Sequence, residues 1–368
     1  MIESNMTLKE VAAHLKVSVS TVRRLIRNGE LSSFRIGAHG QVRVPESAVR
    51  LFCGDTSHNC DEQREPTPPD SHGHEAALES DVTVHAGITK AELNWKVLNA
   101  DVNAGLAMLE PNSINCAVTS PPYYWQRDYE VDGQIGHEAS IEGYVQALVE
   151  VFAGVRKALT SDGTLFLNLG DTYYSAKGKP HGADDKHNGR NMMRRHLRAV
   201  DGPGLGLPRK SLIGIPWRVA LALQQDGWTL RSSVIWQRPA TLPEPTAHDR
   251  PWRTHENIFV FSKGPKYFFN RAGLNGEEDI WKIIARPENP GSHFAPYPRE
   301  LVDRCLACGC PEGGTVLDPF VGSGTTMVSA LANGRNAVGI ELKPKYAEFT
   351  ASRIQKEFGM LLIDKEAA

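Results

Sequence analysis

The sequence has no run of about 18 apolar residues, the length that a membrane-spanning helix needs. Its first residues also lack the basic and then apolar stretches of a signal peptide. Cysteine is scarce, because six in 368 residues do not make a disulfide framework, and Cys116 lies in an apolar run as a small core residue. These absences disfavour membrane-embedded and disulfide-stapled proteins. We therefore expect a cytoplasmic protein with no membrane partner.

Charge is distributed unevenly, although the formal net charge is only −2. Residues 1–52 carry eight Lys or Arg against four Glu, whereas residues 53–90 carry eight acidic against two basic side chains and are rich in Pro, Ser, His and Gly. Residues 175–210 carry nine basic against three acidic side chains. We interpret 1–52 as a basic module, 53–90 as a disordered acidic linker and 91–368 as the main domain, with 175–210 as a mobile basic loop.

The N-terminal module has the pattern of two short helices and a hairpin. Apolar residues at helical spacing follow Thr7, a candidate N-cap, and again follow Ser18 or Ser20. Phe34–Ile36 and Val42–Val44 alternate around a turn that contains glycine. The module resembles the winged helix-turn-helix of excisionase and MerR-like proteins. This resemblance implies that the second helix binds double-stranded DNA through Arg23, Arg24 and Arg27. The alternative is a solvated basic helix face.

Beyond the linker, apolar strand-like runs alternate with helical patterns, which predicts an α/β fold with a mainly parallel sheet. Seven runs are involved: Trp95–Asn99, Ile114–Thr119, Thr164–Leu169, Leu230–Trp236, Ile258–Phe261, Val316–Asp318 and Ala337–Ile340. Ligands of such sheets bind at the carboxyl ends of the strands.

A glycine-rich turn follows the strand that ends at Asp318, and the segment Asp318–Thr325 then opens a helix. It lacks the lysine of a P-loop, so triphosphate binding is disfavoured. Glu341 ends the next strand about 20 positions later, where a carboxylate can accept hydrogen bonds from both ribose hydroxyls. The pattern indicates an adenosine-bearing ligand, and a tight structural turn is the alternative.

A second signal is the tetrad Ser120, Pro121, Pro122 and Tyr123, also at a strand's carboxyl end. The prolines fix the backbone and leave the Pro121 carbonyl free to accept a hydrogen bond from an amine. Ser120 adds a hydroxyl, and Tyr123 adds an aromatic face. The tetrad suits a flat heterocycle with an exocyclic amino group. A proline-aromatic turn that closes a core strand is the alternative for the tetrad alone.

We predict no metal site. Cys305, Cys308 and Cys310 lack a fourth ligand nearby and are expected to pack in the core. The cysteines and histidines of the 53–90 linker match no zinc pattern.

Together these motifs resemble the DNA amino-methyltransferases of the β class, in which the Ser-Pro-Pro-Tyr motif precedes the cofactor motif. The resemblance covers roughly residues 94–358 and implies a Rossmann-like, S-adenosylmethionine-dependent methyltransferase fold with a mostly parallel seven-stranded sheet. It implies base flipping and direct methyl transfer, with Ser120, Pro121, Pro122 and Tyr123 as catalytic residues. The implied S-adenosyl-L-methionine residues are Asp101, Phe294, Asp318, Phe320, Gly322, Ser323, Gly324, Thr325 and Glu341.

The determinants of DNA recognition are less defined. The β class usually uses a stretch that here spans only about 20 residues, near 273–290, so the basic loop or the N-terminal module is expected to contribute. The loop residues expected on DNA phosphates are Arg190, Arg194 and Arg195. An ordinary solvated insertion is the alternative.

Serine before Pro-Pro-Tyr resembles the N4-cytosine enzymes more than the N6-adenine enzymes. We therefore predict a site-specific cytosine-N4 DNA methyltransferase of a restriction-modification system, with N6-adenine methylation as the alternative. A DNA-binding regulator with an inactive methyltransferase domain and an RNA substrate are further alternatives. A C5-cytosine enzyme would need a Pro-Cys nucleophile, which is missing. A homodimer and a cognate restriction endonuclease stay open as partners.

Overall fold

In the computed structural model the chain forms two compact units, Met1–His74 and Glu75–Ala368, and each is described by itself. The described residues are 5–15, 22, 26, 31, 34–36, 41–46, 48–49, 82–126, 134–176, 199–239, 247–274, 276, 278–285 and 297–360. Among the helices in these ranges, none is both long and apolar enough to cross a bilayer.

The first unit combines a short helix with a small antiparallel sheet of order β1-β3-β2. Its elements are β1 (Asn5–Thr7), α1 (Leu8–His14), β2 (Phe34–Ile36) and β3 (Gln41–Pro45). Thr7 is the N-cap of α1, and a capping box with Glu10 satisfies two amides at the start of this short helix. The predicted cap and hairpin are therefore confirmed. Most of the predicted second helix lies outside the described residues, as do Arg23, Arg24 and Arg27.

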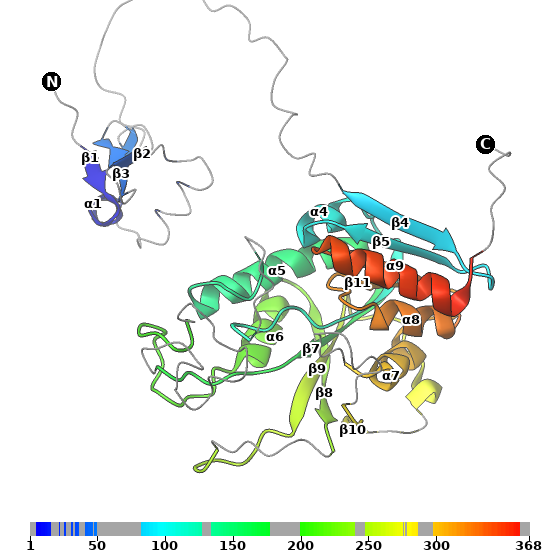
Figure 1. The fold of residues 1–368 in the computed structure, drawn as a ribbon. Helices are drawn as coiled ribbons and strands as arrows, with labels where there is room; N and C mark the ends of the chain where they lie inside the picture. Colours follow the sequence, from blue (N-terminus) through cyan, green and yellow to red (C-terminus); the bar gives the residue numbers. More distant parts are fainter. Residues whose placement is uncertain are drawn as a thin grey trace, which may run out of the picture. The chain divides into compact units, whose positions relative to one another are not determined.

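The second unit is built on a nine-stranded sheet of order β10-β8-β9-β7-β6-β11-β12-β5-β4 in the described residues (Figure 1). The strands are β4 (Thr83–Ile88), β5 (Asn94–Asn99), β6 (Ile114–Thr119), β7 (Leu159–Leu169), β8 (Thr229–Gln237), β9 (His255–Ser262), β10 (Ile280–Lys282), β11 (Thr315–Asp318) and β12 (Asn336–Glu341). Strand β9 is antiparallel to β7 and β8, and β4 is antiparallel to β5, whereas the other pairs are parallel. All seven predicted runs are strands, and the prediction of a mostly parallel sheet is confirmed.

The sheet has two more strands than predicted, β10 at one edge and β4 at the other. Strand β4 lies inside the segment expected to be a linker, so that expectation is wrong for Thr83–Ile88. The strand was missed because it is an edge strand with no fully buried residue, with His, Gly and Thr and no continuous apolar run. Strand β4 is held in the sheet by its backbone pairing with β5 and not by buried side chains of its own.

Helices cover both faces of this sheet (Figure 1). On one face lie α4 (Val102–Ala107), α5 (Ile141–Ala158) and α6 (Ile215–Gln225), and on the other α7 (Arg299–Gly309), α8 (Thr325–Ala332) and α9 (Pro344–Phe358). A short 3-10 helix, η2 (Arg271–Leu274), precedes β10. Because the central strands are buried on both faces, their sequences are mostly apolar, which is why they were predictable.

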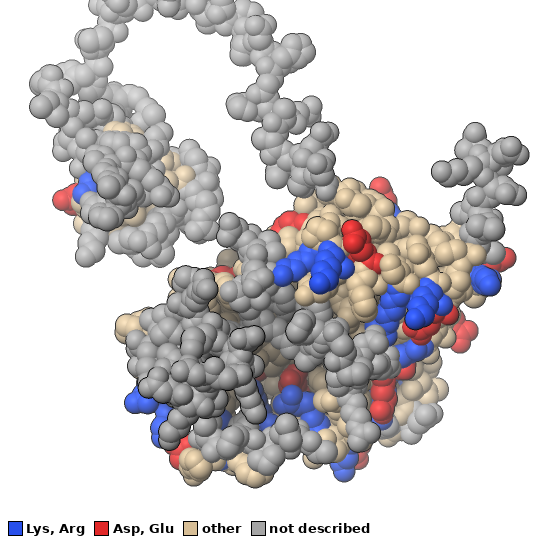
Figure 2. Space-filling view, in the orientation of Figure 1, with Lys and Arg blue, Asp and Glu red and all other residues tan. Residues whose placement is uncertain are grey.

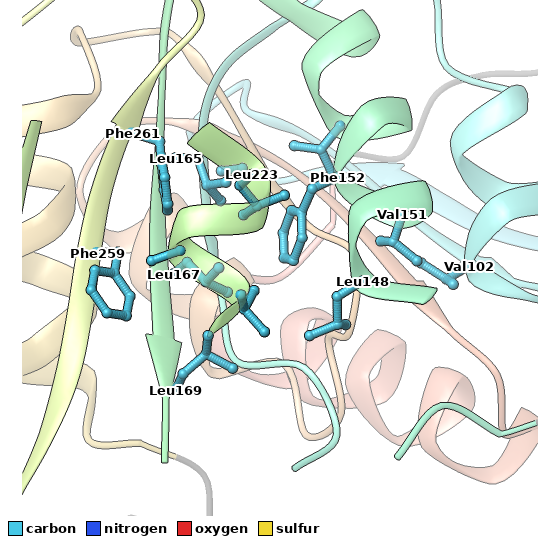
Figure 3. Close-up of a cluster of buried hydrophobic side chains, with 14 of the residues drawn as sticks. Val102, Leu148, Val151, Phe152, Leu165, Leu167, Leu169, Leu223, Phe259 and Phe261 are labelled. Carbon is cyan, nitrogen blue, oxygen red and sulfur yellow. The ribbon is translucent and has the colours of Figure 1, made fainter. Parts of the chain in front are cut away.

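Strand β7 illustrates this two-sided burial. Leu165, Leu167 and Leu169 face the α4–α6 layer, where Phe152 of α5 also lies (Figure 3), whereas Phe166 belongs to the opposite cluster. The cysteines Cys116, Cys305, Cys308 and Cys310 are buried in that second cluster, among the apolar side chains of β6 and α7.

The segment 175–210, expected to be a mobile loop, is only partly described. Residues 177–198, which include Arg190, Arg194 and Arg195, lie outside the described residues. Its last part is packed, since Val200 and Asp201 are buried and the Tyr174 hydroxyl donates to the Gly202 carbonyl at 2.8 Å. Residues 199–202 are therefore packed against the catalytic unit, and the mobility expected for the loop stays a prediction.

Candidate active site

A cavity of about 410 Å³ opens at the carboxyl ends of β5, β6, β11 and β12. The parallel strands end at one edge of the sheet, so segments far apart in sequence meet there. The predicted site residues that line the cavity are Asp101, Ser120, Pro121, Pro122, Tyr123, Asp318, Phe320, Gly322, Ser323, Thr325 and Glu341. The two motifs that the sequence singled out therefore share one cavity. Phe294 lies outside the described residues.

The glycine-rich turn needs glycine at two positions. Gly322 and Gly324 have φ values of 53° and 81°, in the left-handed region that glycine tolerates. A Cβ on Gly324 would also lie 2.6 Å from Thr350 of α9. Gly324 is the N-cap of α8 rather than part of the cavity wall, and it allows the chain to turn sharply from β11 into that helix.

Asp318 is a buried carboxylate, 2% exposed, with four hydrogen-bond donors. Oδ1 accepts from the Thr119 hydroxyl at 2.7 Å and from the Phe320 amide at 3.1 Å. Oδ2 accepts from the hydroxyls of Thr326 at 2.6 Å and Tyr297 at 3.1 Å. Burial raises the pKa of Asp318, although these donors act in the opposite direction. The carboxylate thus joins β6, β11, α8 and the segment before α7 behind the glycine turn.

Glu341 and Asp101 both line the cavity. Glu341, at the end of β12, accepts hydrogen bonds from the amides of Gly322 and Lys343, both at 2.9 Å. Burial raises the pKa of this carboxyl group as well. Asp101 is the N-cap of α4, where its Oδ1 accepts from the Asn103 amide at 2.9 Å. Both acidic side chains are therefore fixed by backbone amides.

The Ser-Pro-Pro-Tyr turn follows β6 and places two polar oxygens at the cavity wall. The Ser120 hydroxyl donates to the Tyr123 oxygen at 3.1 Å. The Pro122 carbonyl accepts from the Tyr144 hydroxyl at 2.8 Å. No residue in the described part of the chain donates a hydrogen bond to the Pro121 carbonyl or to Ser120 Oγ. These two oxygens can therefore accept hydrogen bonds from a ligand.

Tyr123 has a further set of contacts that the sequence did not predict. Its hydroxyl lies 2.8 Å from Glu256 Oε2 and 3.1 Å from Asn168 Oδ1. Burial, and then the negative charge of Glu256, raise the pKa of Tyr123 well above its usual value. Its ring lies against Gly170, where a Cβ would come within 2.5 Å of it. The hydrogen bonds of the hydroxyl thus fix the Tyr123 side chain, in addition to the aromatic face that the sequence predicted.

Asn168, Glu256 and Arg238 complete the polar wall of the cavity but were missing from the predicted site residues. Asn168 is a buried polar residue, 3% exposed, within the apolar run of β7, which is a signal that sequence reasoning could have used. Glu256 lies at the start of β9. Its ion pair with Arg238, at 3.1 Å, depends on the pairing of β8 with β9.

Two family models match the chain: "DNA methylase" over residues 114–352 and "Helix-turn-helix domain" over residues 6–52. The chain therefore belongs to the N6/N4 family of DNA methylases and is a DNA methyltransferase with an N-terminal helix-turn-helix domain. S-adenosyl-L-methionine is the methyl donor of such enzymes.

Among its curated relatives are two Type II methyltransferases. M.SmaI of Serratia marcescens is 43% identical over 270 residues, which cover 70% of this chain and 90% of the relative. M.Cfr9I of Citrobacter freundii is 41% identical over 276 residues, which cover 72% and 90%. A solved structure named PvuII DNA methyltransferase (cytosine-N4-specific) has a TM-score of 0.55 at 20% identity and covers 77% of this chain and 92% of its own. That likeness supports the fold.

The cavity suits this methyl donor. Gly322, which has a left-handed backbone, lines the cavity, and the glycine-rich turn directly follows a buried carboxylate at Asp318. A second carboxylate, Glu341, lines the same cavity at the end of the next strand. A ligand with a cationic amino-acid end and a ribose has chemically matched partners on this wall.

Proposed function

We propose that this enzyme transfers the methyl group to the exocyclic N4 of cytosine in double-stranded DNA. The observation that carries the proposal is the pair of acceptors, Ser120 Oγ and the Pro121 carbonyl, in the cavity that also contains the glycine-rich turn. A serine before Pro-Pro-Tyr, as in the N4-cytosine enzymes that the motif resembles, favours cytosine over adenine.

The proposed cofactor residues follow from the two carboxylates and the turn. Asp318, whose oxygens already accept four hydrogen bonds from the protein, would attract the cationic amino group by its negative charge. Glu341 would accept from the ribose hydroxyls and Asp101 from the adenine amine, with Phe320, Gly322, Ser323 and Thr325 lining the remainder. When bound, S-adenosylmethionine supplies an electrophilic methyl group on a positively charged sulfur.

The proposed catalytic residues act on the target amine. An amine conjugated to a heterocycle is a poor nucleophile because its lone pair is delocalised into the ring. Hydrogen bonds from its two N–H groups to Ser120 Oγ and the Pro121 carbonyl orient it and favour a tetrahedral nitrogen with a localised lone pair. Tyr123 holds a base that has been flipped out of the duplex. The chain's own residues thus supply position and orientation, with no covalent intermediate.

The experiment that tests the target base uses a methylation-deficient bacterial host. The enzyme and its Ser120→Ala variant are expressed, and methylated nucleosides in the host DNA are quantified by mass spectrometry. We expect N4-methylcytosine with the wild type and far less of it with the variant. N6-methyladenine would replace the proposed target, and the absence of both products would contradict the proposal.

Contacts with DNA are proposed for Arg23, Arg24 and Arg27 and for Arg190, Arg194 and Arg195. Figure 2 shows basic and acidic side chains interspersed over the described surface that it presents, so this face by itself defines no single basic patch. The proposal therefore depends on the local charge of 1–52 and 175–210 in the sequence.

Deletion of residues 1–74 should weaken DNA binding by about tenfold or more at moderate salt, because several phosphate contacts are lost, without lowering the melting temperature of the catalytic unit. Fluorescence anisotropy with labelled duplex DNA measures the affinity. Deletion of residues 1–88 is the control for stability, since it also removes β4 and should lower the melting temperature. An unchanged DNA affinity after the shorter deletion would assign the first unit another role.

Cofactor affinity should fall on acidification. Burial raises the pKa of both Asp318 and Glu341, so each takes up a proton at a higher pH than a free carboxyl group, whose pKa is about 4. Protonation removes the negative charge and acceptor capacity proposed to bind the ligand. Calorimetric titration from about pH 8 downward should show the loss beginning above the usual carboxyl range. Constant affinity down to about pH 4 would contradict these roles.

A further inference from the structure

Glu256, at the start of β9, lies in the cavity wall and contacts the tyrosine of the Ser-Pro-Pro-Tyr turn. Its Oε2 accepts hydrogen bonds from the Tyr123 hydroxyl at 2.8 Å and from Asn168 Nδ2 at 3.2 Å. Its Oε1 lies 3.1 Å from Arg238 Nη1, and the glutamate side chain is only 13% exposed. An ionised carboxylate accepts hydrogen bonds and donates none. Every group around Glu256 must therefore donate to it.

Glu256 also fixes the orientation of the neighbouring amide. Asn168 Nδ2 donates to Glu256 and, at 3.3 Å, to the Asn257 carbonyl, so the amide oxygen of Asn168 is turned toward Tyr123. The Tyr123 hydroxyl consequently faces two acceptors. Its raised pKa keeps it protonated, and its single proton is directed to this side. The tyrosine oxygen is then available as an acceptor for Ser120.

The direction of this chain determines what Ser120 offers to a substrate. Ser120 donates its only proton to Tyr123 at 3.1 Å, and no described residue donates to Ser120 Oγ. Its oxygen lone pairs are thus left for the cavity. A target amine can donate an N–H to this oxygen while its own lone pair stays free. If Ser120 instead directed its proton at the amine, that hydrogen bond would occupy the nitrogen lone pair, which must form the new bond.

We propose that Glu256 is a positioning residue that sets the direction of the Ser120–Tyr123–Glu256 hydrogen-bond chain, so that Ser120 faces the target amine as an acceptor. This inference rests on the proposed function in that the nucleophile is an exocyclic amine. It holds for cytosine and for adenine, because both amines need the same free lone pair.

The substitution Glu256→Gln replaces one hydrogen-bond acceptor, a carboxylate oxygen, with a donor NH2 group and changes the shape of the side chain little. Arg238 is a donor, so it should hold the oxygen of the new amide and leave the NH2 group toward Tyr123 and Asn168. A donor then stands where the acceptor stood. Asn168 Nδ2 then meets a donor, so the Asn168 amide turns over and presents its own N–H to Tyr123. With both acceptors replaced by donors, Tyr123 turns its proton toward Ser120, which in turn directs its own proton at the amine.

The test is a double-mutant cycle with Tyr123→Phe, which cuts the link between Ser120 and Glu256. Methyl transfer is measured with radiolabelled cofactor and DNA from a methylation-deficient host. In the wild-type background, Glu256→Gln should lower kcat by about 10- to 100-fold and leave KM for DNA and for cofactor within about twofold. In the Tyr123→Phe background it should have no further effect on kcat.

Two further variants complete the cycle. Glu256→Asp keeps an acceptor-only group and should give a kcat above that of Glu256→Gln, and its effect should also vanish in the Tyr123→Phe background. Glu256→Asp takes the place of Glu256→Gln in the cycle if the glutamine variant does not fold. Glu300→Gln removes an exposed carboxylate that pairs with Arg304 on α7 and is the control for the chemical change, with unaltered kinetics expected.

Three results would overturn the inference: an unchanged kcat in Glu256→Gln, equal kcat values for the Asp and Gln variants, or a further fall of similar size in the Tyr123→Phe background. The last would mean that Glu256 acts through general folding of the cavity. Failure of the proposed function is seen separately, because the methylated nucleoside made by the wild type is identified in the same reaction.

Discussion

Asp318→Ala should abolish S-adenosylmethionine binding and lower the stability of the catalytic unit. The hydroxyls of Thr119, Thr326 and Tyr297 and the amide of Phe320 all donate to this one carboxylate. Alanine leaves the Thr119 hydroxyl and the Phe320 amide without their acceptor, at a cost of about 1–3 kcal/mol for each unsatisfied group. The hydroxyls of Thr326 and Tyr297 keep each other and long contacts to the Val118 carbonyl. The glycine-rich turn then loses the connection that holds it against β6 and α8. It also loses the negative charge proposed for the cofactor's amino group.

Calorimetric titration with the cofactor measures this effect, on protein whose folding has been checked by thermal melting. Asp303→Ala is the matched control, since Asp303 of α7 accepts hydrogen bonds from Ser329 at 2.5 Å and Asn333 at 2.8 Å but does not line the cavity. It should lower stability and keep cofactor affinity. Asp318→Asn replaces the alanine variant if that variant does not fold. Wild-type cofactor affinity in a folded Asp318 variant would contradict the assignment of this wall.

Much of the large domain could be predicted because its central strands are buried on both faces. A strand such as Ile114–Thr119 is then a largely apolar, buried run, broken only by Asn115, that ends at a chemically distinctive turn. The order of the two motifs along the chain allowed the family resemblance to be stated, and the match over residues 114–352 confirms it. Edge strands carry no such signal. Strand β4 is ordered by its pairing with β5 and by α9, neither of which is visible in its own sequence.

The polar wall behind Tyr123 could not be predicted because it depends on strand register. Asn168 pairs with Ile258 in the ladder between β7 and β9, which brings the end of β7 beside Glu256. Glu256 pairs in turn with Trp236 of β8, which brings Arg238 close enough for an ion pair. A one-residue change of register would turn these side chains to the other face of the sheet. The one sequence signal of a polar network was the position of Asn168 within an apolar run.

Ser120→Ala should lower kcat by about 100- to 1000-fold and leave cofactor affinity and melting temperature close to those of the wild type. Ser120 is half-buried and has a single hydrogen bond in the described structure, to Tyr123, so its removal creates little strain. The substitution slows the methyl-transfer step because the amine keeps only one of its two proposed acceptors, the Pro121 carbonyl. An amine that is bound but poorly oriented retains its ring-delocalised lone pair.

The measurement is a single-turnover assay with radiolabelled cofactor at saturating DNA, in parallel with calorimetry. Ser113→Ala is the matched control, because Ser113 lies at the other end of β6 and its hydroxyl donates only to the Glu110 carbonyl, at 2.6 Å. Its turnover should match the wild type. Tyr123→Ala should resemble Ser120→Ala in turnover and in retained cofactor binding. A Ser120→Ala enzyme with nearly full turnover would remove the serine hydroxyl from the mechanism and leave the Pro121 carbonyl as the acceptor that orients the amine.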